Sequence, residues 1–242
     1  MGARAAAPKL AGEAATLARA LARRGFTEGR GLALLLPNTP TLLIAFSAAC
    51  QLGLRLLLVD PREAEARLRA RLREFSPDIL MTSDPTPLFD KTLRLLAHCP
   101  PDIPVVVERF TDLLPFPRNL LAPLLRGGAI ATLPPEPRFL RYGDFVRSTG
   151  KMAPLPSSTP QSVTLLEGSV EPGTLLRKVV CAAGPKRPKE RWLVAAPLGK
   201  AATLARVLRG LYDGAELVLS PRLDRRSLTK LGRQAAIDVE IA

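Results

Sequence analysis

The chain has 242 residues, of which 47% are hydrophobic and only 5% aromatic, and its formal net charge is +13 at pH 7. This composition is that of a globular protein with enough length for one large or two small domains. The basic residues are spread along the chain without aromatic interleaving, so we expect no nucleic-acid partner and attribute the charge to a biased composition, with a dedicated polyanion site as the alternative.

The first predicted element is an amphipathic helix near the N-terminus. Residues 13–24 carry apolar residues such as Leu17 and Leu21 at helical spacing, and Gly25 ends the pattern. The first 25 residues contain no unbroken apolar run of the length that an export signal needs. We therefore expect a cytoplasmic location.

The stretch from residue 31 to residue 60 is predicted to be the centre of the fold. It indicates a strand at 31–36, a helix at 41–52 and a second strand at 54–59. Two buried strands joined by a helix indicate a parallel sheet covered on both faces. A membrane span is the alternative, but Gln51 and Arg55 interrupt the apolar run.

The same alternation continues to the end of the chain and predicts an α/β protein with a partly parallel, layered α/β/α arrangement. We expect a first α/β subdomain over 1–111, a Pro-rich connector over 112–162 and a second α/β subdomain over 163–242. The further elements are helices at 63–75, 88–98 and 204–211, and strands at 79–82, 105–107, 163–166, 192–196 and 214–219.

The cysteines argue against a metal or disulfide framework. Cys50, Cys99 and Cys181 are far apart, odd in number and in no metal-ligand spacing. They indicate a reducing compartment, and we expect no metal site.

The first half of the chain resembles the N-terminal part of the adenylate-forming (AMP-binding) superfamily. The resemblance rests on the segment GRGLALLLPNTPTLLIAFSAACQLGLRLLLVDPR, which is followed by a basic helix and SPDILMTSD. The superfamily has G-D-R-V-A-L-L-L-P-N-S-P, a helix, A-G-A, a strand and N-P. Matching positions are Gly29, Arg30, Ala33, Leu34, Leu35, Leu36, Pro37, Asn38, Pro40, Gly53 and Pro61, with Asp60 where the family often has Asn.

A second segment is similar to one branch of this superfamily. DLLPFPRNLLAPLL, at 112–125, is similar to D-x-L-P-F-P-K-x-L-L-Y-P-L of bacterial long-chain fatty-acid CoA ligases. Its leucines, between Arg118 and Arg126, would suit a lipid interface and a peripheral membrane contact. The alternative is that they pack on the neighbouring sheet.

The resemblance places a phosphate loop, Thr-Ser-Gly-Thr-Thr-Gly-x-Pro-Lys, after the strand at 163–166. In that register Ser169, Gly173 and Arg177 are the predicted nucleotide-contacting residues. Glu171 and Pro172 stand where small or hydroxylated residues are expected. A carboxylate would repel a phosphate by ~1 kcal/mol or more at ~4 Å, and proline removes an amide donor. We therefore expect a degenerate loop.

A later motif is changed as well. Pro197 and Leu198 match the family's P-L-F-H-x-x-G, but Gly199 and Lys200 replace its aromatic residue and histidine. His98, the single histidine, lies elsewhere and is interpreted as structural. Residues 222–224, Arg-Leu-Asp, match the family's R-F-D.

The resemblance implies a truncated or divergent relative of long-chain fatty-acid CoA ligases. Such enzymes use ATP, Mg²⁺ and CoA to activate a fatty acid through an acyl-adenylate. We expect no catalytic residue and no ligase activity from this chain alone, unless a second polypeptide completes the domain. The alternative is a non-catalytic domain, a pseudoenzyme, that binds an acyl group, an acyl carrier or a partner.

Overall fold

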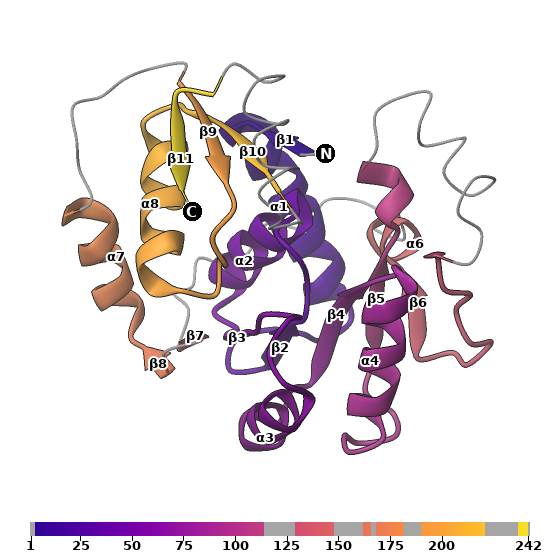
Figure 1. The fold of residues 1–242 in the computed structure, drawn as a ribbon. Helices are drawn as coiled ribbons and strands as arrows, with labels where there is room; N and C mark the ends of the chain where they lie inside the picture. Colours follow the sequence, from indigo (N-terminus) through magenta and orange to yellow (C-terminus); the bar gives the residue numbers. More distant parts are fainter. Residues whose placement is uncertain are drawn as a thin grey trace.

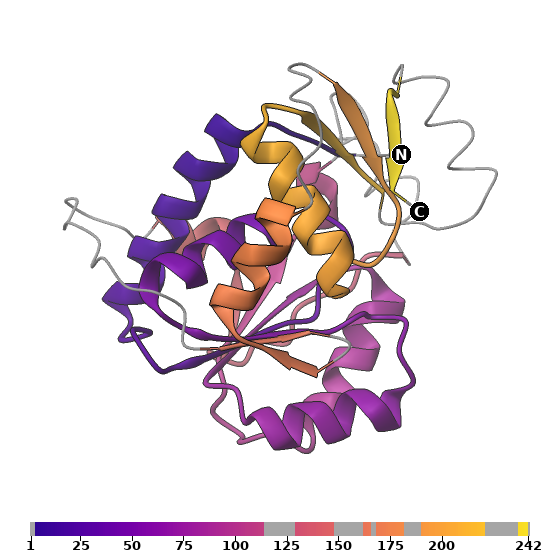
Figure 2. The same ribbon diagram turned by 90° about the vertical axis from the view of Figure 1, so that its left-hand side faces the viewer.

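The computed structural model describes residues 3–113, 129–147, 162–165, 168–181, 190–220 and 237–241. Their strands form two sheets, with one layer of helices between the sheets and another on the outer face of the larger sheet (Figures 1 and 2). The leucine-rich face expected at 120–125 and the match at 222–224 lie outside the described residues.

The larger sheet has seven strands, and every neighbouring pair is parallel except the last, β7 with β8. All residues of β2, β4 and β5 are buried, as a strand covered on both faces requires. The strands lie in the order β6 (Phe139–Arg141), β5 (Val105–Glu108), β4 (Ile79–Ser83), β2 (Gly31–Leu34), β3 (Arg55–Leu58), β7 (Val163–Leu165) and β8 (Gly168–Val170).

Two groups of helices cover this sheet. α1 (Ala7–Arg23), α2 (Pro40–Leu52) and α6 (Tyr142–Arg147) share a hydrophobic core with one face, and α3 (Glu65–Phe75) and α4 (Thr86–Leu96) share a second core with the other. Gly53 ends α2 in the left-handed conformation at φ 67°, a role that glycine fills without strain. Short connections of this kind hold successive strands in register.

The smaller sheet lies across the first helical layer from the larger one (Figure 2). α7 (Pro172–Cys181) and α8 (Ala201–Tyr212) also lie between the two sheets, and one continuous core joins them, since Leu34 of β2 and Val194 of β9 belong to the same cluster. β1 is antiparallel to β10, whereas β9 is parallel to both of its neighbours. The order is β1 (Ala3–Ala5), β10 (Glu216–Leu219), β9 (Arg191–Val194) and β11 (Val239–Ile241).

The predicted α/β class and the parallel sheet are confirmed. Sheet membership was not predicted, and two strands pair with distant parts of the chain. β7, predicted to open the second subdomain, joins the larger sheet, and β1, from the N-terminus, joins the smaller one. The predicted connector also contributes β6 and α6. The division of the chain into domains at residues 111 and 162 stays a prediction.

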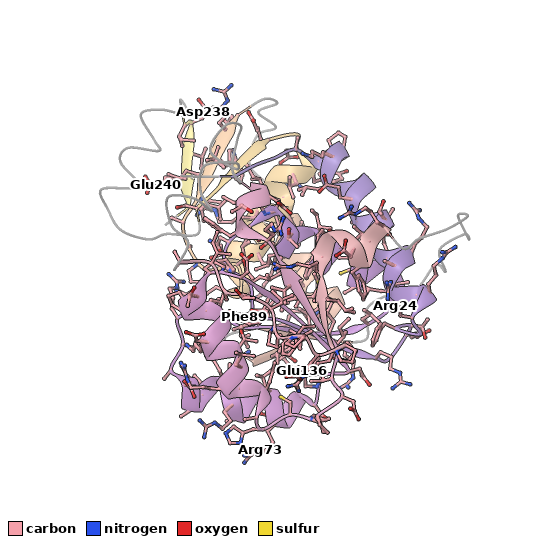
Figure 3. The ribbon with its side chains drawn as sticks, turned by 90° about the vertical axis from the view of Figure 1, so that its right-hand side faces the viewer. Arg24, Arg73, Phe89, Glu136, Asp238 and Glu240 are labelled. Carbon is pink, nitrogen blue, oxygen red and sulfur yellow. The ribbon has the colours of Figure 1, made fainter. Side chains whose placement is uncertain are left out.

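In the described parts of the chain, no helix is long and apolar enough to cross a membrane. The exposed Arg24, which follows α1, and the exposed Arg73 of α3 lie at separate places on the periphery, while Phe89 is buried (Figure 3). Within the described residues, no three His, Cys, Asp or Glu side chains group as metal ligands.

Candidate functional site

A crevice opens where strands of both sheets end. Its volume is about 80 Å³, and it is lined by residues 36–38 after β2, 58–62 around the end of β3, 195 and 197–199 after β9, 220 after β10, and Leu42 of α2. Ligands of open α/β sheets bind outside the carboxyl ends of the strands, which is the position of this crevice. The volume is below the ~300 Å³ of small-molecule pockets, so as formed it encloses a small group or a few waters.

Asn38 fixes one wall of the crevice. Its side-chain amide nitrogen donates to the carbonyl of Ala196 at 2.8 Å and contacts that of Ala195 at 3.5 Å, while its oxygen accepts from the backbone amide of Leu198 at 3.4 Å. One side chain from the larger sheet thus holds the loop that follows β9 in the smaller sheet. An amide suits this position because it both donates and accepts.

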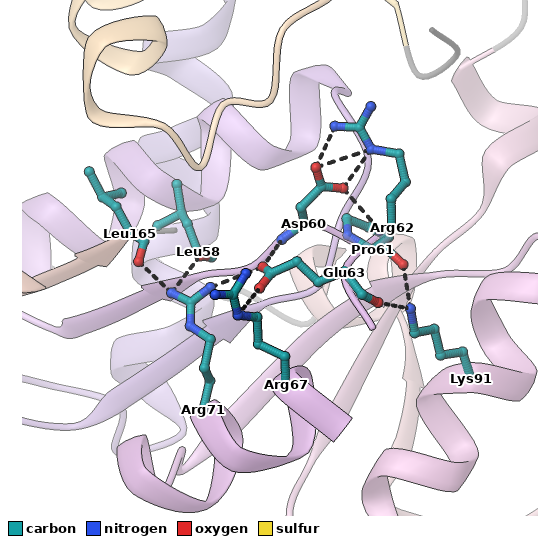
Figure 4. A network of polar contacts seen from close by, with 9 residues as sticks. All are labelled: Leu58, Asp60, Pro61, Arg62, Glu63, Arg67, Arg71, Lys91 and Leu165. Atoms are coloured by element: carbon teal, nitrogen blue, oxygen red, sulfur yellow. Dashed lines mark hydrogen bonds and ion pairs between the residues drawn. The ribbon is translucent and has the colours of Figure 1, made fainter. Parts of the chain in front are cut away.

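Asp60 and Arg62 form the polar rim of the crevice. The guanidinium of Arg62 donates from Nε to both carboxylate oxygens of Asp60, at 2.8 and 3.0 Å, and from Nη2 to Oδ2 (Figure 4). Burial alone would raise the pKa of Asp60, but hydrogen bonds from Arg62 and the charges of Arg62 and Lys91 lower it below its usual range. The rim therefore carries an ionised, charge-balanced pair at neutral pH.

Behind the rim, Glu63 anchors the turn that carries Asp60 and Arg62. Its carboxylate accepts from Arg71 at 3.0 Å and from the backbone amide of Asp60 at 3.2 Å. Arg71 also donates to the carbonyl of Leu165 at the end of β7, which ties α3 to the sheet (Figure 4). Charge-assisted bonds to partly buried groups are the stronger kind, so this network fixes the rim geometry.

The predicted nucleotide-contacting residues lie on two elements rather than on one loop. Ser169 is in β8, where its hydroxyl pairs with that of Thr164 at 3.1 Å. Gly173 and Arg177 are in α7, and Arg177 is exposed and donates to the Thr174 hydroxyl at 3.2 Å. These positions do not line the crevice. Their role as phosphate contacts stays a prediction.

The motif that begins at Pro197 lies at the crevice. Pro197, Leu198 and Gly199 line the crevice, and Lys200 is the exposed residue before the first turn of α8. His98 is exposed in the turn after α4. Asn38 matches the family motif and Asp60 stands where the family often has Asn, but no role was predicted for either residue.

The residues 8–117 match the family profile described as AMP-binding enzyme. A long-chain-fatty-acid–CoA ligase of Bacillus subtilis (strain 168) is 30% identical over 115 residues, which are 46% of this chain and 20% of that protein. The chain thus spans about one fifth of this curated relative.

Solved structures extend the likeness to nearly the whole chain at the level of the fold. A Mycobacterium tuberculosis fatty acyl CoA synthetase has a TM-score of 0.68 at 15% identity, covering 96% of this chain and 42% of that one. A red-emitting luciferase of Phrixothrix hirtus has a TM-score of 0.70 at 14% identity, covering 94% of this chain and 43% of that one.

Residues 8–117 are thus similar to AMP-binding enzymes, and the fold of the described residues is similar to that of the fatty acyl CoA synthetase structure. The curated protein reported above is a long-chain-fatty-acid–CoA ligase, which agrees with the family that the sequence resembles. The chain covers less than half of either matched structure.

Proposed function

We propose that this chain is a divergent relative of long-chain fatty-acid CoA ligases that binds an acyl group but does not, by itself, form an acyl-adenylate. The observation that carries the proposal is the geometry of residues 168–181. Where the resemblance places a glycine-rich phosphate loop, the chain forms β8 and α7, and Glu171 alone connects them. A triphosphate needs several free backbone amides at one place.

Two backbone amides at this position are engaged within the chain. Those of Thr174 and Leu175 donate to the carbonyl of Glu171, at 2.9 and 3.1 Å, and Pro172 has no amide hydrogen. The exposed Glu171 adds a negative charge beside the start of α7, which repels phosphate. These features support the proposal that residues 168–181 do not hold ATP in the way the family resemblance implies.

The crevice supports the other half of the proposal. Its walls are mostly aliphatic or proline, and the rim offers Arg62 and Asp60 as polar partners. Apolar walls with few polar groups are the usual lining of sites for small organic ligands. Since about 80 Å³ is too small for a long chain, we propose that the crevice holds one end of the acyl group and that the rest lies outside it.

Two measurements on the purified chain test this function. With ATP, magnesium and a long-chain fatty acid, we expect no pyrophosphate release, while a long-chain-fatty-acid–CoA ligase under the same conditions serves as the positive control. With a fluorescent fatty acid, we expect saturable binding that Leu198→Phe weakens, because the larger side chain fills the crevice. The exposed Glu74→Gln is the matched control and should bind normally.

The outcomes separate the candidate functions. Pyrophosphate release would establish ligase chemistry and contradict the proposal. Absence of both pyrophosphate and acyl binding would leave a role as a partner-binding domain, completed by a second polypeptide. Unchanged acyl binding in a folded Leu198→Phe variant would place the acyl site elsewhere than in the crevice.

A further inference from the structure

A buried carboxyl group lies at the end of β5 without a cationic partner. Glu108 is only 3% exposed, and its Oε1 has no hydrogen-bond partner. Its Oε2 accepts a hydrogen bond from the hydroxyl of Thr39 at 3.2 Å. Within the described part of the chain, no arginine or lysine forms an ion pair with Glu108. Holding a charge in such a place costs several kcal/mol unless it is paired.

The groups around Glu108 do not neutralise it. Ser83 lies opposite it in the parallel register of β4 and β5, and the fully buried Ser83 hydroxyl also lacks a hydrogen-bond partner. The pKa of Glu108 is raised from its usual value to about 7: burial raises it most, the Thr41 and Thr39 hydroxyls lower it, and the charges of Asp84 and Asp112 raise it.

Within the described residues, two arginines near Glu108 act on Asp84 instead. Arg141 of β6 forms its ion pair with Asp84, at 3.4 Å, and the charge of Arg109 also acts on Asp84. Tyr142 of α6 has its pKa raised by burial and by the charges of Glu13 and Glu108, so it is neutral at pH 7. Glu108 is therefore the group in this cluster whose proton is exchanged near neutrality.

A short path of contacts joins Glu108 to the crevice. Thr39 is the residue before the first turn of α2, yet its hydroxyl does not cap the helix and instead donates to Glu108. The next residue toward the N-terminus is Asn38, whose amide holds the loop after β9 through Ala196 and Leu198. A movement of Thr39 would move Asn38 with it, because the two share a peptide bond.

We propose that Glu108 is a positioning residue for the crevice: its protonated carboxyl, held by Thr39, fixes the turn at 37–40 and hence Asn38, and loss of the proton releases this turn. The ionised carboxylate gains hydration only if the covering turn moves, since Thr39 is itself 1% exposed. The hydroxyls of Thr39 and Thr41 stabilise the ionised form but do not cancel the effect of burial, so hydroxyl donation does not offset the loss of hydration. This device does not depend on which ligand the crevice takes.

The test uses the whole chain and nuclear magnetic resonance between pH 5.5 and pH 8.5. The side-chain carboxyl carbon of Glu108 should titrate near neutrality, and the side-chain amide signals of Asn38 should shift with the same midpoint. The emission of Trp192, the single tryptophan and a β9 residue, should follow them. The Trp192 indole donates to the carboxylate of Glu190 at 2.9 Å, and a Glu190→Gln background controls for this contact.

Three variants separate positioning from a merely structural role. Glu108→Gln should abolish the pH response of Asn38, whereas the exposed Glu74→Gln should leave it unchanged. Asp84→Asn should shift the midpoint to lower pH, because a like charge is removed. Thr39→Val, which keeps the carboxyl, should let Glu108 titrate while Asn38 no longer follows.

The proposal is overturned if the Asn38 signals stay flat while Glu108 titrates, or if they still respond in Glu108→Gln. If Glu108→Gln does not fold, Thr39→Val decides the question. An unchanged Asn38 response in that variant would refute the coupling through Thr39. None of these readouts uses ligand binding, so the result is independent of the acyl-binding proposal.

Discussion

Replacing Asn38 by alanine should loosen the contact between the two sheets at the crevice. The substitution removes the hydrogen bond to the Ala196 carbonyl at 2.8 Å and the longer contacts to Ala195 and Leu198. Ala196 is buried, at 7% exposure, so its carbonyl would be left without this partner. A buried group left unsatisfied costs about 1–3 kcal/mol, and the two long contacts add little. We expect a loss of about 2 kcal/mol in the free energy of unfolding.

Urea unfolding followed by Trp192 emission measures this change, because Trp192 lies in β9, the strand that precedes the loop held by Asn38. Thr16→Ala is the matched control, since it also removes a side-chain bond to a backbone carbonyl, at 3.0 Å, but on the exposed face of α1. It should change the free energy of unfolding by less than about 0.5 kcal/mol. An unfolding midpoint in Asn38→Ala equal to that of Thr16→Ala would contradict the role of Asn38 in holding the loop after β9.

Three further outcomes follow from the packing and the charges. Gly210→Ala should destabilise the fold by about 1–3 kcal/mol in urea unfolding, because the new Cβ would lie 2.7 Å from the Trp192 ring. Gly12→Ala in α1 is the control and should be neutral or stabilising, because a Cβ at this position has nothing within 4 Å. The pKa of Glu108 is raised from 4.5 to about 7, so the unfolded chain loses this proton at lower pH than the folded chain does. The free energy of unfolding should therefore fall as the pH rises between those values, by at most about 3 kcal/mol. The Glu108→Gln variant should not show this fall. Arg71→Met should cost about 1–3 kcal/mol in thermal unfolding, because it leaves the mostly buried Glu63 without one of its cations. A flat pH profile, or a variant as stable as the wild type, would contradict the corresponding statement.

The strands and helices of the first hundred residues could be predicted because the sequence changes its period where the structure changes. The run 31–36 predicted β2 (Gly31–Leu34), and the apolar stretch that Gly53 ends predicted α2 (Pro40–Leu52). Buried parallel strands are continuously apolar, so their pattern is strong even when they are short. Strands such as β1, β6 and β8 have three residues each, and three residues carry no measurable period.

Sheet membership could not be predicted for the same physical reason. β7 pairs with β3, which is more than a hundred residues earlier, through Leu56 opposite Val163. Nothing in either strand distinguishes this partner from another apolar strand. The pairing depends on how α1 and α2 fill the space between the sheets, which is a property of the whole core.

The crevice shows a similar limit. The family resemblance pointed to Asn38 as a match and to Asp60 as a departure, but it gave no role to either. The role of Asn38 depends on Ala196, far away in the chain, whereas that of Asp60 depends on Arg62 in the same turn. Glu108 was not singled out, although a carboxylate directly after three valines in β5 is an available signal. A charged residue at the end of a buried strand either contacts a partner or holds a proton, and only the structure decides which.

The position of Thr39 relates the stability of this protein to the geometry of its candidate site. A threonine before the first turn of a helix ordinarily accepts from a helical amide, which is worth about 1 kcal/mol. Here that contribution is given up, because the hydroxyl donates to Glu108. The first turn of α2 is therefore held by a contact to β5 rather than by its own cap. Any change at Glu108 acts on the segment that carries Asn38, and through it on the loop that closes the crevice.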